Sequence, residues 1–189
     1  MAENIFSIVG NPKSSSDYEV IDDVLSKDEL STIVDLIIWN IDFPWYLRRK
    51  IEGRHVEESS SFYGTHLFYY IGFPINLDNR NVSKYCPIVQ PIVNFITNFT
   101  GIKSILRIKG NFYPQTDTII EHKKHSDFDY SNKSAIFYLN TCDGFTRLGD
   151  GTKIESVENR LLFFDGGELH NSSTCTDEPA RFNINFNYL

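Results

Sequence analysis

The stretch ARFNINFNYL, residues 180–189, ends the sequence with a strict alternation of polar and apolar side chains. In an extended strand, alternate side chains point to opposite faces of the sheet. One face of this segment therefore carries only polar groups, namely Arg181, Asn183, Asn185 and Asn187. The other carries the apolar Phe182, Ile184 and Phe186. The pattern predicts a β-strand with an apolar face and a polar face that includes an arginine.

Similar short runs, rich in β-branched and aromatic residues, fill the chain upstream of this strand. They cover 104–113, 118–122, 134–140, 153–157, 160–164 and 169–174. Turn signals separate them, such as Gly149-Asp150-Gly151 and Asp165-Gly166-Gly167. Many short strands at a spacing of about 8–12 residues indicate a β-sandwich or a barrel. We expect residues 141–153 to form a loop between two of the strands.

The N-terminal half has a different pattern. Two short apolar runs, 5–9 and 18–24, are predicted edge strands, and 65–71 is a further strand. Ser26 and Glu29 have capping-box spacing, and apolar residues then recur at helical intervals, which predicts a helix over 27–40. A second helix is expected within 84–100, and the polar stretch 43–64 is expected to be a loop or lid.

These patterns together predict an α+β fold in which a double-sheet β-core carries helices on one face. The chain of 189 residues has the length of one domain. We expect a single domain over 1–189, with support elements and substrate loops in 1–103 and the core in 104–189.

Composition excludes several classes of protein. The 18 Lys and Arg against 25 Asp and Glu give a net charge of −7, which disfavours nucleic acid and anionic membranes as partners. No apolar run approaches the roughly 18 residues of a membrane span. The start, Met1 to Ile5, lacks the features of a secretory signal, so we expect a cytoplasmic protein. Cys86, Cys142 and Cys175 form no C-x-x-C pair and are expected to be reduced thiols.

Three residues offer a set of metal ligands. His125 and Asp127 are two positions apart and share a face if the segment is extended, and His170 begins a later predicted strand. Two imidazoles and one carboxylate are typical of non-haem Fe(II) oxygenases, in which they leave three coordination positions open. Zinc hydrolases use similar ligands, so the ligand types alone do not decide between the two metals.

Arg181 favours the oxygenase. It lies 11 positions after His170, in the next predicted strand, on the polar face described above. A buried arginine is costly unless it meets an anion, and its planar guanidinium suits a carboxylate. A dicarboxylic co-substrate that chelates iron at one end and pairs with Arg181 at the other explains both features. 2-Oxoglutarate has this shape.

In these residues the sequence resembles the Fe(II)/2-oxoglutarate-dependent dioxygenases, whose signature is His-x-Asp, a distant His and an Arg about ten residues later. Asn111-Phe112-Tyr113 and Arg181-Phe182-Asn183 resemble elements of the alkylation-repair branch, and Gly144-Phe145-Thr146 resembles a turn of the prolyl-hydroxylase-like members. More loosely, the Phe-Pro-Trp-Tyr stretch at 43–46 is similar to small oxygenases of marine phages. The resemblance covers about 104–189.

The resemblance implies a double-stranded β-helix (jelly-roll) core with the N-terminal helices packed on one sheet. It implies that His125, Asp127 and His170 bind Fe(II), that Arg181 binds 2-oxoglutarate, and that Tyr113, Asn183 and Asn111 contact it. The activity would be hydroxylation of an unactivated C–H by O2, with ascorbate as a supporting reductant and decarboxylation to succinate and CO2. The substrate would be peptidyl proline or a small metabolite, and a phage-encoded enzyme would work in the host cytoplasm.

Two departures and several alternatives bear on this assignment. The alkylation-repair branch has a second arginine where this chain has Asn187, and the first glycine of the prolyl-hydroxylase turn is here Asp143. His122 is expected to be exposed, and Asp129 is an alternative acid ligand. His55 and His66 are expected to be surface or packing residues, and the basic cluster at 48–54 to be a solvated face or a lid. A noncatalytic cupin-like module that binds a metal or a ligand is the alternative function.

Overall fold

The computed structural model describes residues 17–48, 62–71 and 82–189, and within these ranges ten strands form two antiparallel sheets. The larger sheet has seven strands in the order β1-β8-β5-β10-β4-β3-β2. Their bounds are β1 Glu19–Ile21, β2 Tyr46–Arg48, β3 Tyr63–Tyr70, β4 Ile105–Pro114, β5 Lys133–Tyr138, β8 Leu161–Asp165 and β10 Ala180–Tyr188. The smaller sheet has the order β7-β6-β9, with β6 Cys142–Arg147, β7 Lys153–Ser156 and β9 Asn171–Ser172.

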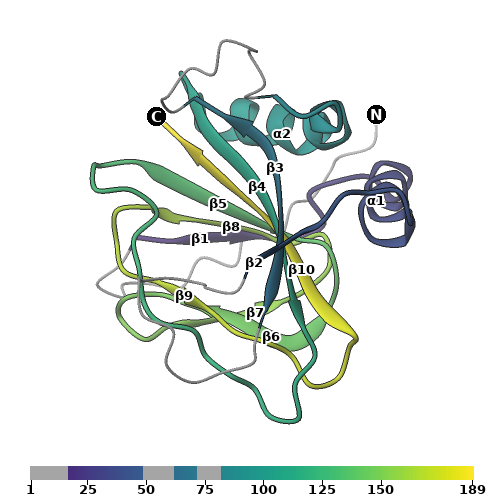
Figure 1. Cartoon of the computed structure of the whole chain (residues 1–189). Coiled ribbons are helices and arrows are strands. Elements are labelled where there is room, and N and C mark those ends of the chain that lie inside the picture. Colours follow the sequence, from purple (N-terminus) through teal and green to yellow (C-terminus); the bar gives the residue numbers. More distant parts are fainter. Residues whose placement is uncertain (1–16, 49–61, 72–81) are drawn as a thin grey trace.

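The two faces of the larger sheet carry different apolar clusters. In β5, Phe137 belongs to the larger cluster, whereas its neighbours Ile136 and Tyr138 belong to a smaller one with Leu148 and Ile154 of the small-sheet region. This follows from the two-residue period of a strand. The smaller cluster therefore lies between the sheets, and the larger one lies on the outer face of the seven-stranded sheet (Figure 1).

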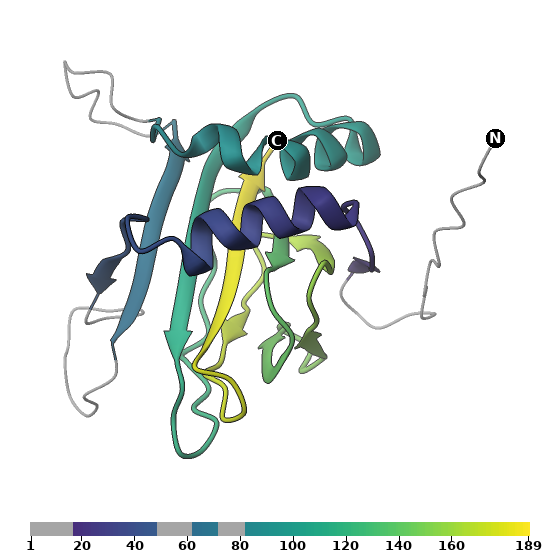
Figure 2. The same ribbon diagram turned by 90° about the vertical axis from the view of Figure 1, so that its right-hand side faces the viewer.

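The helices cover that outer face. Helix α1 (Lys27–Val34) begins at the predicted capping box of Ser26 and Glu29, and it continues as a π-helix over Asp35–Trp39. A 3-10 turn (Cys86–Val89) leads into α2 (Gln90–Thr100). Ile33, Ile37, Ile92 and Ile96 are buried against the sheet. Figure 2 shows α1 running across β4 and β10, with α2 beside it. The predicted α+β architecture, with helices on one sheet, is confirmed.

One predicted loop and two predicted strands differ from the structure. The expected loop over 141–153 contains β6, because Asp143-Gly144, which the sequence presents as a turn, lies inside a strand that bulges between Cys142 and Phe145. The predicted strand over 118–122 is reduced to one bridge, Glu121 to Ser173. The predicted strand over 169–174 forms only the short β9, extended by bridges at His170 and Ser173.

Some expectations fall on residues outside the described ranges. They concern the edge strand over 5–9, most of the predicted loop over 43–64, and the basic residues Arg49, Lys50 and Arg54. Among the helices that are described, none combines the length and apolar character that a membrane span requires.

Candidate active site

A ladder of four cross-strand pairs between β4 and β10 forms the floor of the site. The pairs are Arg107 with Asn187, Lys109 with Asn185, Asn111 with Asn183, and Tyr113 with Arg181. Because side chains alternate along both strands, all eight lie on the face that looks toward the smaller sheet. Ile184 and Phe186, on the opposite face of β10, pack in the helix-covered cluster. The predicted polar and apolar faces of residues 181–187 are therefore present.

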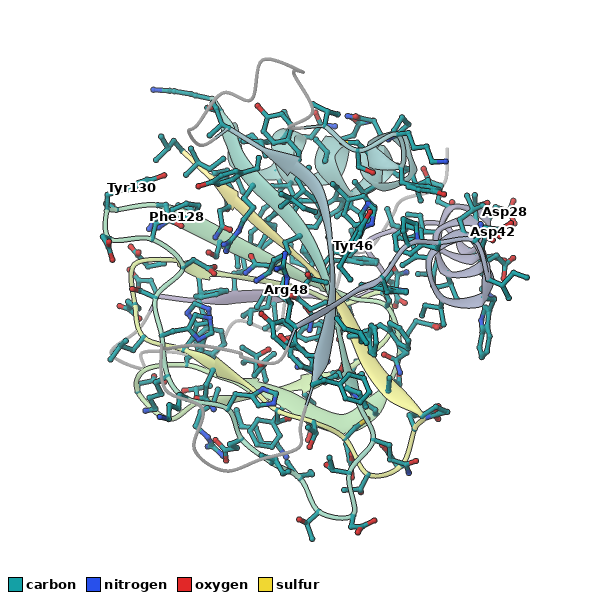
Figure 3. All side chains as sticks on the ribbon, viewed as in Figure 1. Asp28, Asp42, Tyr46, Arg48, Phe128 and Tyr130 are labelled. Carbon is teal, nitrogen blue, oxygen red and sulfur yellow. The ribbon has the colours of Figure 1, made fainter. Side chains whose placement is uncertain are left out.

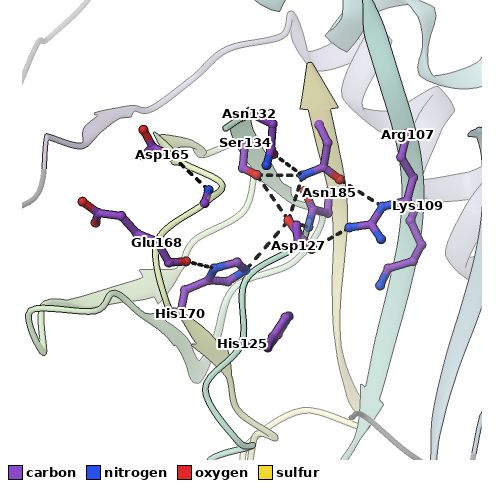
Figure 4. Close-up of polar contacts among 12 residues, drawn as sticks. Arg107, Lys109, His125, Asp127, Asn132, Ser134, Asp165, Glu168, His170 and Asn185 are labelled. Atoms are coloured by element: carbon purple, nitrogen blue, oxygen red, sulfur yellow. Dashed lines mark hydrogen bonds and ion pairs between the residues drawn. The ribbon is translucent and has the colours of Figure 1, made fainter. Parts of the chain in front are cut away.

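Above this floor, two segments bring His125, Asp127 and His170 together. His125 and His170 form an antiparallel bridge, with two backbone N–H to carbonyl hydrogen bonds of 2.8 Å. Each of the three residues offers a ligand atom within 4.8 Å of the other two. His170 Nε2 lies 3.9 Å from Asp127 Oδ2, and both side chains are almost fully buried. Figure 4 shows the three side chains meeting at one place.

Backbone carbonyls define the tautomer of both histidines. His170 Nδ1 lies 3.0 Å from the carbonyl oxygen of Glu168, and His125 Nδ1 lies 3.4 Å from that of Lys123. Since a carbonyl only accepts hydrogen bonds, Nδ1 is the protonated nitrogen in each ring. In a neutral ring of this tautomer, Nε2 presents a lone pair, which is the form of imidazole that binds a metal ion.

Asp127 is held by donors on both of its oxygens (Figure 4). Arg107 Nη2 donates to Oδ1 at 2.5 Å, and Oδ2 accepts from Asn187 at 2.8 Å, Asn185 at 2.9 Å and Ser134 at 3.2 Å. Burial by itself raises the pKa of this carboxyl. The Arg107 charge and the amide donors outweigh that effect, so the pKa of Asp127 is far below its usual value and the group is ionised at neutral pH.

Arg181 is fully buried and has no carboxylate partner within the described ranges. Its Nη2 donates to Thr146 Oγ1 at 2.9 Å, and its Nη1 donates to the Ser173 carbonyl at 3.4 Å. The guanidinium carbon lies 5.7 Å from the Tyr113 ring centre and 5.4 Å from that of Tyr138. Its hydrogen-bond and ring contacts among the described residues are thus with neutral groups.

One cavity connects these groups. It is lined by the three His and Asp side chains and, further along the β4–β10 ladder, by Asn183, Asn111, Tyr113 and Thr146. Arg181 lies behind this lining and contacts two of its residues, Tyr113 and Thr146. Four buried polar atoms lack a hydrogen-bond partner among the described residues: Asn111 Oδ1, Asn171 Oδ1, Asn185 Oδ1 and Arg181 Nε. All four belong to residues that line or adjoin this cavity. Buried polar groups normally have partners, so these atoms are available for hydrogen bonds to a polar ligand.

The residues predicted to contact a co-substrate are in this cavity. Tyr113 is 7% exposed, Asn183 is 4% and Asn111 is 3%. Asn111 Nδ2 donates to Asn183 Oδ1 at 3.0 Å. Burial raises the pKa of Tyr113 above its usual value, so its hydroxyl stays protonated and can donate to an anion.

The alternative ligands lie elsewhere. Asp129 is exposed and is not part of the His and Asp cluster. His66 is 3% exposed and is bonded to the Pro44 carbonyl and the Ser83 hydroxyl, as expected of a packing residue. His55 lies outside the described ranges. Arg48 of β2 is exposed near the middle of the view in Figure 3 and lies 3.4 Å from Thr65 Oγ1.

His122 differs from the expectation of an exposed side chain. It is half-buried, its ring packs against Tyr113 at 5.0 Å, and its Nδ1 lies 2.8 Å from Ser172 Oγ. Desolvation, together with the charge of Arg181, lowers the pKa of His122 to about 4. At neutral pH it is therefore an uncharged group beside the arginine.

Sequence reasoning missed the residues that hold Asp127 in place, above all Arg107. Arg107 also donates to Asn187 at 2.9 Å and lies against the ring of Phe128, which Figure 3 places at the edge of the molecule. The Arg107 guanidinium therefore contacts Asn187, the position at which the alkylation-repair branch has its second arginine. A signal was available, because residues 105–113 alternate like 180–189 and place Arg107, Lys109, Asn111 and Tyr113 on one face.

No protein-family model and no curated protein sequence matches this chain. Solved structures do resemble it. A prolyl-4-hydroxylase from Pseudomonas putida superposes with a TM-score of 0.60 at 15% identity, over 92% of both chains. The collagen prolyl hydroxylase of Paramecium bursaria Chlorella virus 1, solved with 2-oxoglutarate, gives 0.57 at 15% identity, over 92% of this chain and 95% of that one. A 2OG-Fe(II) oxygenase family protein from Burkholderia pseudomallei gives 0.62 at 14% identity, over 90% and 83%.

At these identities the likeness establishes the fold. The chain has the double-stranded β-helix fold of the 2-oxoglutarate and Fe(II) oxygenases, as the resemblance in its sequence implies.

Proposed function

We propose that this protein is an Fe(II)- and 2-oxoglutarate-dependent oxygenase that hydroxylates a C–H bond of its substrate. The observation that carries the proposal is the fully buried Arg181, which has no protein carboxylate among the described residues and adjoins a cavity lined by two histidines and an aspartate. A metal-binding module without a dicarboxylic ligand gives no reason for this charge. An oxygenase that binds 2-oxoglutarate needs both features in one cavity.

The donor set fits ferrous iron. His125 and His170, with Nδ1 directed at backbone carbonyls, would offer Nε2 to the metal, and Asp127 would supply an ionised carboxylate; together they make the facial set of non-haem iron sites. Asp127 has about four lone-pair sites, so a metal ion at Oδ2 would take one of them from an amide donor. Arg107 remains on Oδ1 and limits rotation of the carboxylate.

The opposite part of the cavity fits the distal carboxylate of 2-oxoglutarate. That group would accept hydrogen bonds from Arg181, Thr146 and the Tyr113 hydroxyl, and it would give Arg181 the anion that the protein lacks. Asn185, which contacts Asp127, and Arg181 are four residues apart on β10, which is about 13 Å of strand.

Bound iron and 2-oxoglutarate would supply activation of O2 and oxidation of the substrate C–H, with release of succinate and CO2. The chain would supply the rest. Asn111 and Asn183 would orient the co-substrate, and their buried position would exclude water. Neutral His122 would pack beside Tyr113 without competing with Arg181 for the anion.

Peptidyl proline is the leading substrate class, ahead of small metabolites. Its support is the fold, which is shared with a prolyl-4-hydroxylase and with a collagen prolyl hydroxylase. The net charge of −7 weighs against nucleic acid as substrate. We expect the working partners to be 2-oxoglutarate, O2 and a peptide or small molecule, with ascorbate as a supporting reductant.

The test is turnover without substrate. Purified protein with Fe(II), ascorbate and 2-oxoglutarate should form succinate, and Mn(II) with 2-oxoglutarate should raise the melting temperature above that with Mn(II) alone. Proline-rich peptides should then gain 16 Da. Arg181→Lys should weaken 2-oxoglutarate binding far more than metal binding, because an ammonium cannot replace the planar guanidinium.

Arg147→Lys is a matched control. Arg147 also makes a two-pronged contact, to Glu121 at 2.7 and 2.8 Å, but that pair is at the surface. This variant should bind 2-oxoglutarate normally. Metal binding without succinate formation and without any 2-oxoglutarate effect would identify a noncatalytic cupin-like module instead.

A further inference from the structure

A second group of reactive side chains lies beside the candidate active site, in the small-sheet region. Cys142, at the start of β6, and Cys175, in the segment before β10, are 6% and 0% exposed. Their sulfur atoms lie within 4.8 Å of each other, and the Cys175 thiol donates to the Glu178 carbonyl at 3.4 Å. Neither thiol has a role in the proposed reaction. Cys86, the remaining cysteine, lies in the 3-10 turn before α2 and packs against the helix-covered cluster.

Reciprocal hydrogen bonds hold the two cysteines opposite each other. The residue after Cys142 is Asp143, whose carboxylate accepts from the Thr176 backbone at 2.8 Å and also from the Thr176 hydroxyl. In return, the Asp143 backbone N–H donates to the Asp177 carboxylate at 3.0 and 3.1 Å. Each chain segment thus binds the other directly next to its cysteine, which keeps the thiols close together.

The same two segments build the surroundings of Arg181. Ser173, two residues before Cys175, accepts from Arg181 through its carbonyl. Gly144, two residues after Cys142, is so close that an added Cβ would lie 2.6 Å from Arg181 Cδ and 3.4 Å from Cys142 Sγ. A change in the spacing of the segments must therefore move atoms that touch Arg181.

We propose that Cys142 and Cys175 are a redox pair, and that their oxidation to a disulfide pulls β6 toward segment 173–175 and thereby weakens anion binding at Arg181. A disulfide needs its sulfurs about 2 Å apart, so the thiols must approach each other on oxidation. The first part of the proposal is independent of the oxygenase reaction, whereas the effect on 2-oxoglutarate rests on the proposed function.

Hydrogen peroxide is a sufficient oxidant. The Cys142 thiolate attacks one peroxide oxygen, the O–O bond breaks, and Cys142 becomes a sulfenic acid while hydroxide leaves. The Cys175 thiol then attacks the Cys142 sulfur, the S–O bond breaks, and the hydroxyl leaves as water with the thiol proton. Two thiols lose two electrons and one peroxide becomes two waters. Cys142 is suited to the first step because the neighbouring Cys175 thiol and the charge of Arg181 lower its pKa to about 7.

The test begins with the reduced, metal-free protein treated with hydrogen peroxide in small excess. We expect a loss of 2 Da, a fall from three free thiols to one in the unfolded protein, and a peptide that links Cys142 to Cys175. Cys142→Ser and Cys175→Ser should each abolish the loss of 2 Da, and the control Cys86→Ser should keep it. The dissociation constant of 2-oxoglutarate, measured with Mn(II), should rise about fivefold or more on oxidation. It should return to its initial value when dithiothreitol reduces the disulfide.

Several results would overturn the proposal. Additions of 16 or 32 Da without any cross-link would show that the thiols oxidise separately. A zinc ion held by both thiols in the purified protein would identify a metal site with Asp177 in place of a redox pair. If the disulfide forms and 2-oxoglutarate affinity stays constant in a protein that makes succinate, control of Arg181 is refuted. If no 2-oxoglutarate binds in either state, it is the proposed function that has failed.

Discussion

Replacing each of the two arginines of the site by methionine should have opposite consequences for folding and for ligand binding. Arg107 forms a 2.5 Å ion pair with Asp127, and their side chains are 16% and 3% exposed. Arg107→Met leaves a buried carboxylate without its counter-ion, which typically costs about 3 kcal/mol. For a chain of this length that corresponds to a fall of roughly 10 °C in melting temperature.

Arg181→Met should leave the stability of the ligand-free protein nearly unchanged. The lost hydrogen bond to Thr146 is worth about 2 kcal/mol. The two ring contacts, to Tyr113 and Tyr138, are worth about 1 kcal/mol each. Removing a buried charge that has no protein counter-ion returns several kcal/mol. The contributions nearly cancel, so we expect a change within about 1 kcal/mol, or roughly 3 °C.

The assay is a melting curve of each variant, first alone and then with Mn(II) and 2-oxoglutarate. At a concentration 100 times its dissociation constant, the co-substrate should stabilise the wild-type protein by about 2.7 kcal/mol. Arg181→Met should lose this increase, and Arg107→Met should retain part of it. A fall in ligand-free stability for Arg181→Met as large as that for Arg107→Met would refute the reasoning, because neutral protein groups would then suffice to balance the buried charge.

Three further predictions test other parts of the site. His125→Ala should abolish Mn(II) binding in calorimetry while the circular dichroism of the β-core stays unchanged, and retained binding would contradict the ligand assignment. His122 has a pKa of about 4 in the folded protein and a usual value of 6.5 in the unfolded chain, so the unfolded chain binds more protons between these two pH values. The metal-free protein should therefore lose stability as the pH falls from 6.5 to 4, in total on the order of 3 kcal/mol. Urea unfolding of His122→Asn at pH 6.5 and 4.5 should show a smaller loss than wild type, and an equal loss would exclude His122 as its source. Gly144→Ala should destabilise the protein by about 2 kcal/mol and weaken 2-oxoglutarate binding, since its Cβ would lie 2.6 Å from Arg181 Cδ and 2.7 Å from the Thr174 carbonyl oxygen. The control Gly167→Ala, whose Cβ would make one contact of 3.2 Å, should change stability and 2-oxoglutarate binding only mildly.

Features with a local cause could be predicted from the sequence. The two-residue period of 181–187 arises within one strand, and it correctly separated the polar face of β10 from the face under the helices. The capping box of Ser26 and Glu29 involves residues three apart, and it marked the start of α1. Neither feature depends on where the rest of the chain lies.

Features that depend on distant contacts could not be read in this way. Gly144 belongs to a turn by composition, yet it lies in β6, where the Arg181 side chain passes so close that an added Cβ would not fit. Arg107 lies 20 residues before Asp127 in the sequence and meets it beside Asn187, the residue with which Arg107 pairs across β4 and β10. Half-buried His122 depends in the same way on packing against Tyr113. In each case the sheet order decides the environment of the residue.

The β4–β10 ladder also acts as a molecular ruler. Inward-facing positions on β10 recur only every second residue, so the backbone can change the separation between an anchoring side chain and the Asp127 region only in steps of about 7 Å. One methylene more or less in a diacid changes its length by far less than such a step. A preference for a diacid one carbon longer or shorter would therefore arise from exchanging the side chain at position 181 or its neighbours, and a shift of the strand could not produce it.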